Sequence, residues 1–197
     1  MQQRQLENFF RDLGSLLVLP LKIYITGGVL AWHFGGQRPT EDIDFAIKSL
    51  QDETELSQLL FDLAKKHRIA LEFSSDISRW GMVGYKKIEK NAIFYKRYGR
   101  LRVYYLNPVV WSVGKMGRYL KQDIEDLLLV FKKVRPSWKK LIRVWSDALR
   151  ESPASSEKAL FVKRAEYFLL RYGKEVWGEK FDIAQARHYF EKTLVRP

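Results

Sequence analysis

The sequence predicts a mixed α/β fold followed by a helical region. Up to residue 106, short apolar runs typical of strands alternate with segments of helical periodicity, whereas from residue 108 onward the apolar spacing is helical throughout. With 197 residues, 46% of them apolar, the chain can bury a core of its own. It has no Cys, which excludes disulfides and thiolate-bound metals. We expect an α/β core at 1–106 and a helical region at 107–197.

The elements of the first half follow from apolar spacing and from residues that begin or end helices. Pro20 ends the opening helix, because proline lacks an N–H and clashes with the preceding turn. Asp52 or Thr54 can cap the long helix that follows. In chain order we expect a helix at 2–17, a strand at 21–25, a turn at 26–28, a helix at 29–34, a strand at 43–48, a helix from 52 or 54 to 67, and strands at 69–73, 92–95 and 101–106.

The second half begins with Asn107, a typical N-cap, and Pro108, which fits the first turn of a helix. Residues 151–156, with three Ser and Pro153, form the one linker-like stretch. We expect helices at 108–120, 122–134, 137–150, 156–172 and 182–194.

The net charge of +12 is concentrated in two basic blocks. Residues 79–102 hold 8 basic and 1 acidic residue and residues 132–150 hold 7 and 1, whereas residues 1–78 hold 8 basic and 11 acidic residues. Aromatic residues are interspersed in both blocks: Trp80, Tyr85, Phe94, Tyr95 and Tyr98 in the first, Trp138 and Trp145 in the second. Basic side chains contact phosphates and aromatic rings stack on bases, so the blocks predict nucleic-acid contact. A solvated basic face over core aromatics is the alternative.

No apolar stretch is long enough to span a membrane, because Pro20 and Lys22 interrupt the longest one. Glu7 and Asp12 also interrupt the basic flank that a secretory signal would need. We therefore expect a cytoplasmic protein without a membrane partner.

The most informative stretch is the pair Gly27 and Gly28, followed 14 residues later by Asp42 and, two further on, Asp44. Strand alternation places both carboxylates on one face about 7 Å apart, where they can hold two Mg²⁺ ions. Glycines between a strand and a helix let the backbone approach a phosphate closely. Taken singly, each motif is more often structural, as a turn or a solvated strand end. Together they fit nucleotidyl transfer.

This order of strand, Gly-Gly, short helix and Asp-x-Asp resembles the nucleotidyltransferase superfamily related to DNA polymerase beta. The resemblance implies a nucleotidyltransferase-type mixed sheet flanked by helices, followed by a C-terminal helical bundle. It also implies that Gly27 and Gly28 hold the triphosphate and that Asp42 and Asp44 bind Mg²⁺. We assign Thr40 to nucleotide binding as well.

A second motif lies near the junction of the two halves and comprises Lys115, Arg118, Asp123 and Asp126. It resembles the signature of the nucleotidyltransferase-like toxins of the abortive-infection and type IV toxin–antitoxin group and of their uncharacterised bacterial relatives. We expect Lys115 and Arg118 to face the triphosphate from one helix, and the two carboxylates, in the first turn of the next helix, to orient them. For Arg118 and Asp126 a structural ion-pair network between packed helices is the alternative.

Most members of the superfamily add a third carboxylate, which deprotonates the attacking hydroxyl. Two residues are candidates. Glu72 lies between Leu71 and Phe73 in the hydrophobic–acid–hydrophobic pattern, and Asp76 falls in a stretch that resembles the uncharacterised relatives. The sequence leaves both open.

These observations predict an enzyme that moves an NMP from an NTP to an acceptor hydroxyl with Mg²⁺. The basic blocks favour RNA as acceptor. The toxin resemblance implies a tRNA 3′ end, and an antitoxin as protein partner. Two alternatives stay open: a non-catalytic nucleotide- or RNA-binding module or toxin–antitoxin partner on the same fold, and nucleotidyl transfer to a small molecule.

Overall fold

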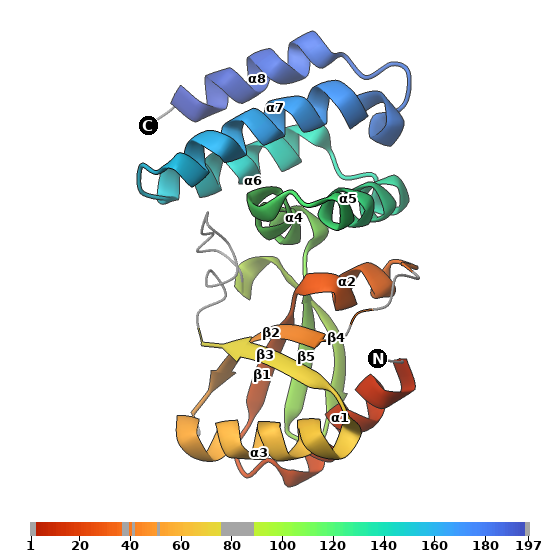
Figure 1. Cartoon of the computed structure of the whole chain (residues 1–197), viewed down its shortest axis with the longest axis vertical. Helices are drawn as coiled ribbons and strands as arrows, with labels where there is room; N and C mark the ends of the chain where they lie inside the picture. The colour runs from red at the N-terminus through yellow and green to blue at the C-terminus, as the bar shows by residue number, and fades with distance from the viewer. Residues whose placement is uncertain (1–2, 37–39, 41, 51, 76–88, 196–197) are drawn as a thin grey trace. The chain divides into compact units, whose positions relative to one another are not determined.

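The computed structural model describes residues 3–36, 40, 42–50, 52–75 and 89–195 (Figure 1). They form a mixed α/β fold in which a five-stranded mixed sheet is followed by helices, as the sequence predicts. The described residues divide into two compact units. The first unit takes those within Met1–His33, Gln37–Ile77 and Ala92–Leu106, and the second those within Phe34–Gly36, Ser78–Asn91 and Asn107–Pro197.

The first unit holds the sheet and three helices. Its elements are α1 (Gln3–Leu16), β1 (Leu21–Ile25), α2 (Gly27–His33), β2 (Asp42–Ser49), α3 (Glu53–His67), β3 (Ala70–Ser74), β4 (Ala92–Tyr98) and β5 (Leu101–Leu106). The strand order is β3-β2-β1-β5-β4. The pairs β1–β5 and β2–β3 are parallel, and the pairs β1–β2 and β4–β5 are antiparallel. In Figure 1 α2 lies above the strands and α3 below them.

One face of the sheet packs on α1 and α3, and we call it the α1/α3 face. The ring of Phe73 in β3 stacks on Phe45 in β2 and contacts Phe61 in α3, while Tyr98 in β4 contacts Phe10 in α1. Core side chains on this face are fully buried: Leu21, Ile23, Ile25, Ile43, Phe45, Leu101 and Val103. Because side chains alternate along a strand, the residues between these lie on the other side, which we call the opposite face.

The second unit contains the short 3₁₀ helix η2 (Glu89–Asn91) and five α-helices. These are α4 (Pro108–Arg118), α5 (Lys121–Val134), α6 (Trp138–Glu151), α7 (Ser156–Trp177) and α8 (Ile183–Val195). Its core is aromatic, and the fully buried rings include Trp111, Trp145, Phe131, Phe161, Phe168 and Phe190. The buried indole N–H of Trp145 donates to the Ser112 hydroxyl at 2.9 Å, so this polar group is satisfied inside the core.

The caps that the sequence indicates are present. Asp52 accepts hydrogen bonds from the backbone N–H groups of Thr54 and Glu55 at the start of α3. Asn107 accepts one from Val109 at the start of α4. These bonds satisfy N–H groups that the first turn of a helix leaves without partners.

Several boundaries differ from those expected: the strand expected at 92–95 continues to Tyr98, and the helix expected at 108–120 ends at Arg118, for example. The expected turn at 26–28 is the start of α2 instead, because Gly27 adopts a φ of 62° and the chain enters the helix at once. Helix α7 continues through Gly173 to Trp177, although we expected it to end at residue 172. A Cβ at Gly173 would overlap the ring of Phe181, so tertiary packing explains this glycine inside a helix.

Within the described part of the chain, no helix combines the length and apolarity that crossing a membrane requires.

Candidate metal centre

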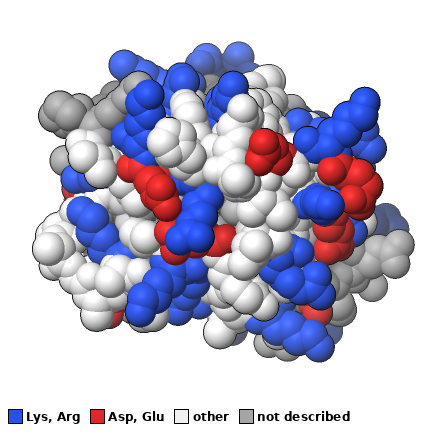
Figure 2. All heavy atoms as spheres, turned by 90° about the horizontal axis from the view of Figure 1, so that it is seen from above, with Lys and Arg blue, Asp and Glu red and all other residues white. Residues whose placement is uncertain are grey.

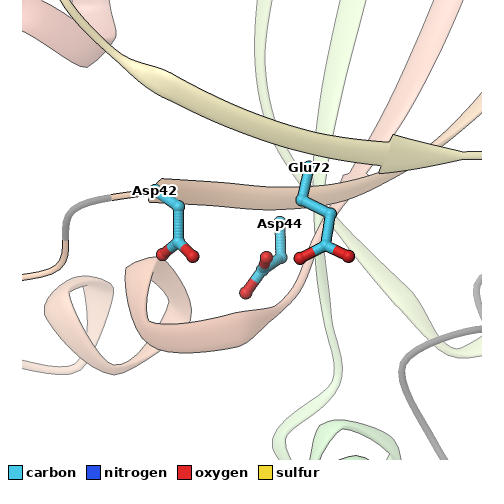
Figure 3. Close-up of side chains that lie close together, drawn as sticks. All are labelled: Asp42, Asp44 and Glu72. Atoms are coloured by element: carbon cyan, nitrogen blue, oxygen red, sulfur yellow. The ribbon is translucent and has the colours of Figure 1, made fainter.

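Three carboxylates converge at the edge of the sheet formed by β2 and β3. Asp42, Asp44 and Glu72 each offer an oxygen, and these oxygens all lie within 4.8 Å of one another. Figure 3 shows the three side chains pointing to the same side of the two strands. Asp42 is partly buried and Glu72 is exposed, so the cluster is open to a ligand from solvent.

Strand alternation and strand register together build this cluster. Asp42 and Asp44 lie on the opposite face of β2, while Ile43 and Phe45 between and after them are buried on the α1/α3 face. The parallel pairing of β2 with β3 sets Glu72 directly beside Asp44. Shifting the register by one residue would turn Glu72 to the other face.

Thr40 and Gly27 flank the two aspartates. The buried Thr40 hydroxyl lies 3.1 Å from Asp42 Oδ1, to which it donates, and this contact fixes the orientation of the carboxylate. A Cβ at Gly27 would overlap the Asp44 carboxylate, so the backbone approaches this carboxylate as closely as only glycine allows. The Thr26 N–H also donates to the Asp44 carbonyl at 2.9 Å. Gly28 is the second residue of α2.

Replacing Gly27 with Ala should therefore damage the cluster. The new Cβ needs the space of the Asp44 carboxylate, and a φ of 62° is unfavourable for any residue with a Cβ. We expect the free energy of unfolding to fall by about 1–3 kcal/mol, as measured by urea denaturation, and divalent-cation affinity to fall with it.

Gly114→Ala is the matched control. Among the described residues, no atom beyond the adjoining backbone of α4 lies within 4 Å of a Cβ at Gly114, so alanine should leave the stability unchanged or raise it by up to about 1 kcal/mol. Equal stability of the Gly27→Ala variant and the wild type would contradict the close approach of the Gly27 backbone to the Asp44 carboxylate.

The donor set fits a hard divalent cation. Carboxylate oxygens are ligands that Mg²⁺ prefers, and oxygens bound to one Mg²⁺ at 2.0–2.1 Å lie at most about 4 Å apart. Oxygens within 4.8 Å of one another reach that arrangement by small side-chain rotations. Of the two candidates for a third carboxylate, Glu72 lies in the cluster and Asp76 lies outside the described residues.

The second motif forms an ion-pair network inside the helical unit. The Lys115 ammonium lies 2.7 Å from Asp126 Oδ2 and 2.9 Å from Asp123 Oδ1, and its side chain is only 3% exposed. Arg118, which is more exposed, pairs with Asp123 at 2.9 Å. The structure thus shows the structural alternative that the sequence left open. A contact of Lys115 with a triphosphate stays a prediction.

Trp111 belongs to the same network, and the sequence motif did not include it. The Lys115 Nζ lies 5.4 Å from the centre of the Trp111 ring, within the range of a cation–π interaction. The two residues are four apart in α4, the spacing of neighbours on a helix. That spacing was the only signal for this contact in the sequence.

Opposing effects act on the Asp123 carboxyl. Burial raises its pKa, but the hydrogen bond from Arg118 and the charge of Lys115 outweigh burial, so the pKa lies below its ordinary value of 3.8. A carboxyl whose pKa is lowered by folding stabilises the folded state above its unfolded pKa. This contribution is lost as the pH falls through the lower, folded pKa.

Acidification below about pH 4 should therefore lower the free energy of unfolding, because the unfolded chain then binds more protons than the folded one. Asp123→Asn removes this titrating group, so its stability should depend less steeply on pH in this range. Urea denaturation at a series of pH values measures the slopes. Parallel profiles for the variant and the wild type would contradict a titrating Asp123.

The basic side chains of the block at 132–150 are exposed to solvent. All its Lys and Arg residues are exposed: Lys132, Lys133, Arg135, Lys139, Lys140, Arg143 and Arg150. Figure 2 shows basic side chains spread over the molecule as seen from above, with a few acidic side chains among them. Part of the charge is neutralised locally, as in the pair between Lys132 and Glu175 at 2.7 Å.

The aromatics of the two blocks divide between core and surface. Trp145 is fully buried, and the buried Tyr98 donates its hydroxyl to Glu7, so neither is available to stack on a base. These two residues are core aromatics beneath a basic surface, which is the alternative to nucleic-acid contact that the sequence left open. Phe94 is 55% exposed, and Trp80 and Tyr85 lie outside the described residues.

No protein-family model, no curated protein and no solved structure matches this chain. Any function assigned to it therefore rests on its own residues and their geometry.

Proposed function

We propose that the protein is a Mg²⁺-dependent nucleotidyltransferase that moves an NMP from an NTP to an acceptor hydroxyl. One observation carries this proposal: oxygens of Asp42, Asp44 and Glu72 lie within 4.8 Å of one another beside the glycine that opens α2. Three acidic side chains gathered on neighbouring strands concentrate negative charge, which a divalent cation neutralises.

Each residue of the cluster has a role in this proposal. Asp42 and Asp44 hold Mg²⁺, which when bound neutralises charge on the triphosphate. Thr40 fixes the Asp42 carboxylate in place. The exposed Glu72 accepts the proton of the acceptor hydroxyl, whose oxygen then bonds to the α-phosphorus while pyrophosphate leaves. Gly27 keeps space for the Asp44 carboxylate at the start of α2.

RNA is the acceptor that the charge distribution favours. The chain has a net charge of +12, and exposed basic side chains attract a polyanion. A tRNA 3′ end and an antitoxin partner follow from the toxin resemblance and belong to this proposal. A cationic small-molecule acceptor is less compatible with so basic a chain, because like charges repel it.

Two differently labelled nucleotides test the proposal. The purified protein is incubated with Mg²⁺, total RNA and each NTP in turn, labelled at either the α- or the γ-phosphorus. We expect α-label on RNA and γ-label in released pyrophosphate, both abolished by EDTA. Transfer of the γ-label would indicate phosphoryl transfer, and no transfer of either label would contradict the proposal. Equal α-labelling of small acceptors without RNA would contradict RNA as acceptor.

The second candidate function is a non-catalytic nucleotide- or RNA-binding module. It is favoured by the burial of Lys115, whose ammonium, expected at the triphosphate, is held by Asp123 and Asp126. The effect of NTP on thermal unfolding separates the two functions, because a bound ligand stabilises the folded state. An intact metal site predicts a larger increase in Tm with Mg²⁺ than with EDTA, whereas a metal-independent increase favours the binding module.

A further inference from the structure

Four basic residues form a line across the opposite face of the sheet. In the strand register Lys22 of β1 is paired with Lys48 of β2 on one side and with Arg102 of β5 on the other, and Arg102 is paired with Arg97 of β4. Paired residues on adjacent strands lie about 5 Å apart on the same face. We call these four residues the basic row.

Aromatic residues form a second line next to the basic row. Tyr24 is paired with Tyr104, and Tyr104 is paired with Phe94. The Tyr24 and Tyr104 rings stack with centres 5.2 Å apart, and the Phe94 ring meets Tyr104 edge-on at 5.6 Å. We call these three residues the aromatic row.

The carboxylate cluster continues the same pattern. Along β2 the residues on this face are Asp42, Asp44, Ala46 and Lys48, and Ala46 is paired with Tyr24. With about 3.3 Å per residue along β2, Ala46, which is level with the aromatic row, lies about 7 Å from Asp44, and Lys48 of the basic row lies about 13 Å from it. One face of the first unit therefore carries basic, aromatic and acidic side chains in that order.

The two rows are accessible to a ligand. Lys48, Arg97 and Arg102 are exposed, Phe94 is 55% exposed, and Lys22 and Tyr104 are partly exposed. Tyr24 is buried and supports the Tyr104 ring from beside it. Like charges directly opposite each other on adjacent strands repel, and a bound anionic ligand lowers this repulsion.

We infer that this face binds a single strand of nucleic acid, with its phosphates on the basic row and a base on the exposed Phe94 ring at the end of the aromatic row. Aromatic rings stack on any base that is not paired, and lysine and arginine neutralise the backbone. A duplex hides its base faces and cannot use the aromatic row. The identification of this strand as the RNA acceptor, with its reactive end at the carboxylate cluster, rests on the proposed function.

Binding of a fluorescein-labelled single-stranded RNA of mixed sequence, measured by anisotropy in EDTA without NTP, tests the inference. Arg97→Gln with Arg102→Gln should weaken binding about 10-fold at about 0.1 M salt and lower the slope of log affinity against log salt by about 1.4, because two phosphate contacts are lost. Phe94→Ala should weaken binding about 10-fold without changing the slope.

Lys65→Gln with Lys66→Gln is the matched control, since both lysines are exposed on α3 and their removal changes the net charge equally. It should change the affinity less than twofold. Equal losses in the two double variants, an unaffected Phe94→Ala variant, or equally tight binding of duplex RNA would each overturn the inference. Circular dichroism and Tm verify that each variant is folded.

The same assay separates this inference from the proposed function. Asp44→Asn should bind the RNA as tightly as the wild type in EDTA, because the binding rows remain intact. A wild-type protein that binds RNA through these rows but transfers no nucleotide contradicts the proposed function alone. If the wild type and the Arg97/Arg102 variant transfer nucleotide to RNA with equal efficiency, the inferred binding face is contradicted and the proposed function is not.

Discussion

Replacing Asp44 with Asn should lower the rate of nucleotidyl transfer by at least about 100-fold and leave the fold intact. The substitution keeps the size of the side chain but removes the negative charge at the centre of the cluster, between Asp42 and Glu72. A bound metal ion stabilises transition-state charge by several kcal/mol, and each 1.4 kcal/mol corresponds to a factor of ten in rate. The α-label assay measures the effect.

Asp42→Asn should have a similar effect, and Asp62→Asn is the control. Asp62 is an exposed carboxylate on α3 that accepts a hydrogen bond from Gln58. Asp62→Asn changes the net charge by the same amount as Asp44→Asn, but at a surface site outside the carboxylate cluster. Its activity should therefore stay within about twofold of the wild type. Retention of most of the activity by the Asp44 variant would show that the cluster does not hold the catalytic metal.

Replacing Lys115 with Met should lower the free energy of unfolding by about 3–5 kcal/mol. Removing one partner of a buried ion pair leaves the other charge uncompensated, and here Asp126 loses its 2.7 Å contact. For a chain of this length the loss corresponds to a decrease in Tm of about 10 °C. The cation–π contact with Trp111 is lost as well.

Lys121→Gln is the control for Lys115→Met. Lys121 forms a solvent-exposed pair with Glu125 at 3.9 Å, and such pairs contribute little. Its Tm should stay within about 2 °C of the wild type. An unchanged Tm in Lys115→Met, together with a loss of NTP affinity, would contradict the structural role and support the triphosphate contact that the resemblance implies.

The carboxylate cluster could be predicted only in part from the sequence. Alternation along a strand is local, so Asp42 and Asp44 could be assigned to one face with Ile43 and Phe45 on the other. The choice of Glu72 depends on the pairing of β2 with β3, which is set by packing between distant segments. No local pattern fixes that register.

The same limit applies to the rest of the molecule. Helix caps such as Asp52 and Asn107 could be predicted from the sequence, because the capping hydrogen bond joins residues only two or three apart. The burial of Lys115 and the close approach of Phe181, which explains the glycine at position 173, depend on packing against other elements. The basic row also needed the structure, because its four residues come from four different strands.

Binding of Mn²⁺ in the absence of nucleotide tests the central claim most directly. Mn²⁺ accepts the same oxygen ligands as Mg²⁺, and its electron paramagnetic resonance signal reports the free ion. We expect the wild-type protein to reduce this signal on titration and Asp44→Asn to leave it unchanged. Equal reduction by the two proteins, or none by the wild type, would contradict a metal centre at Asp42 and Asp44.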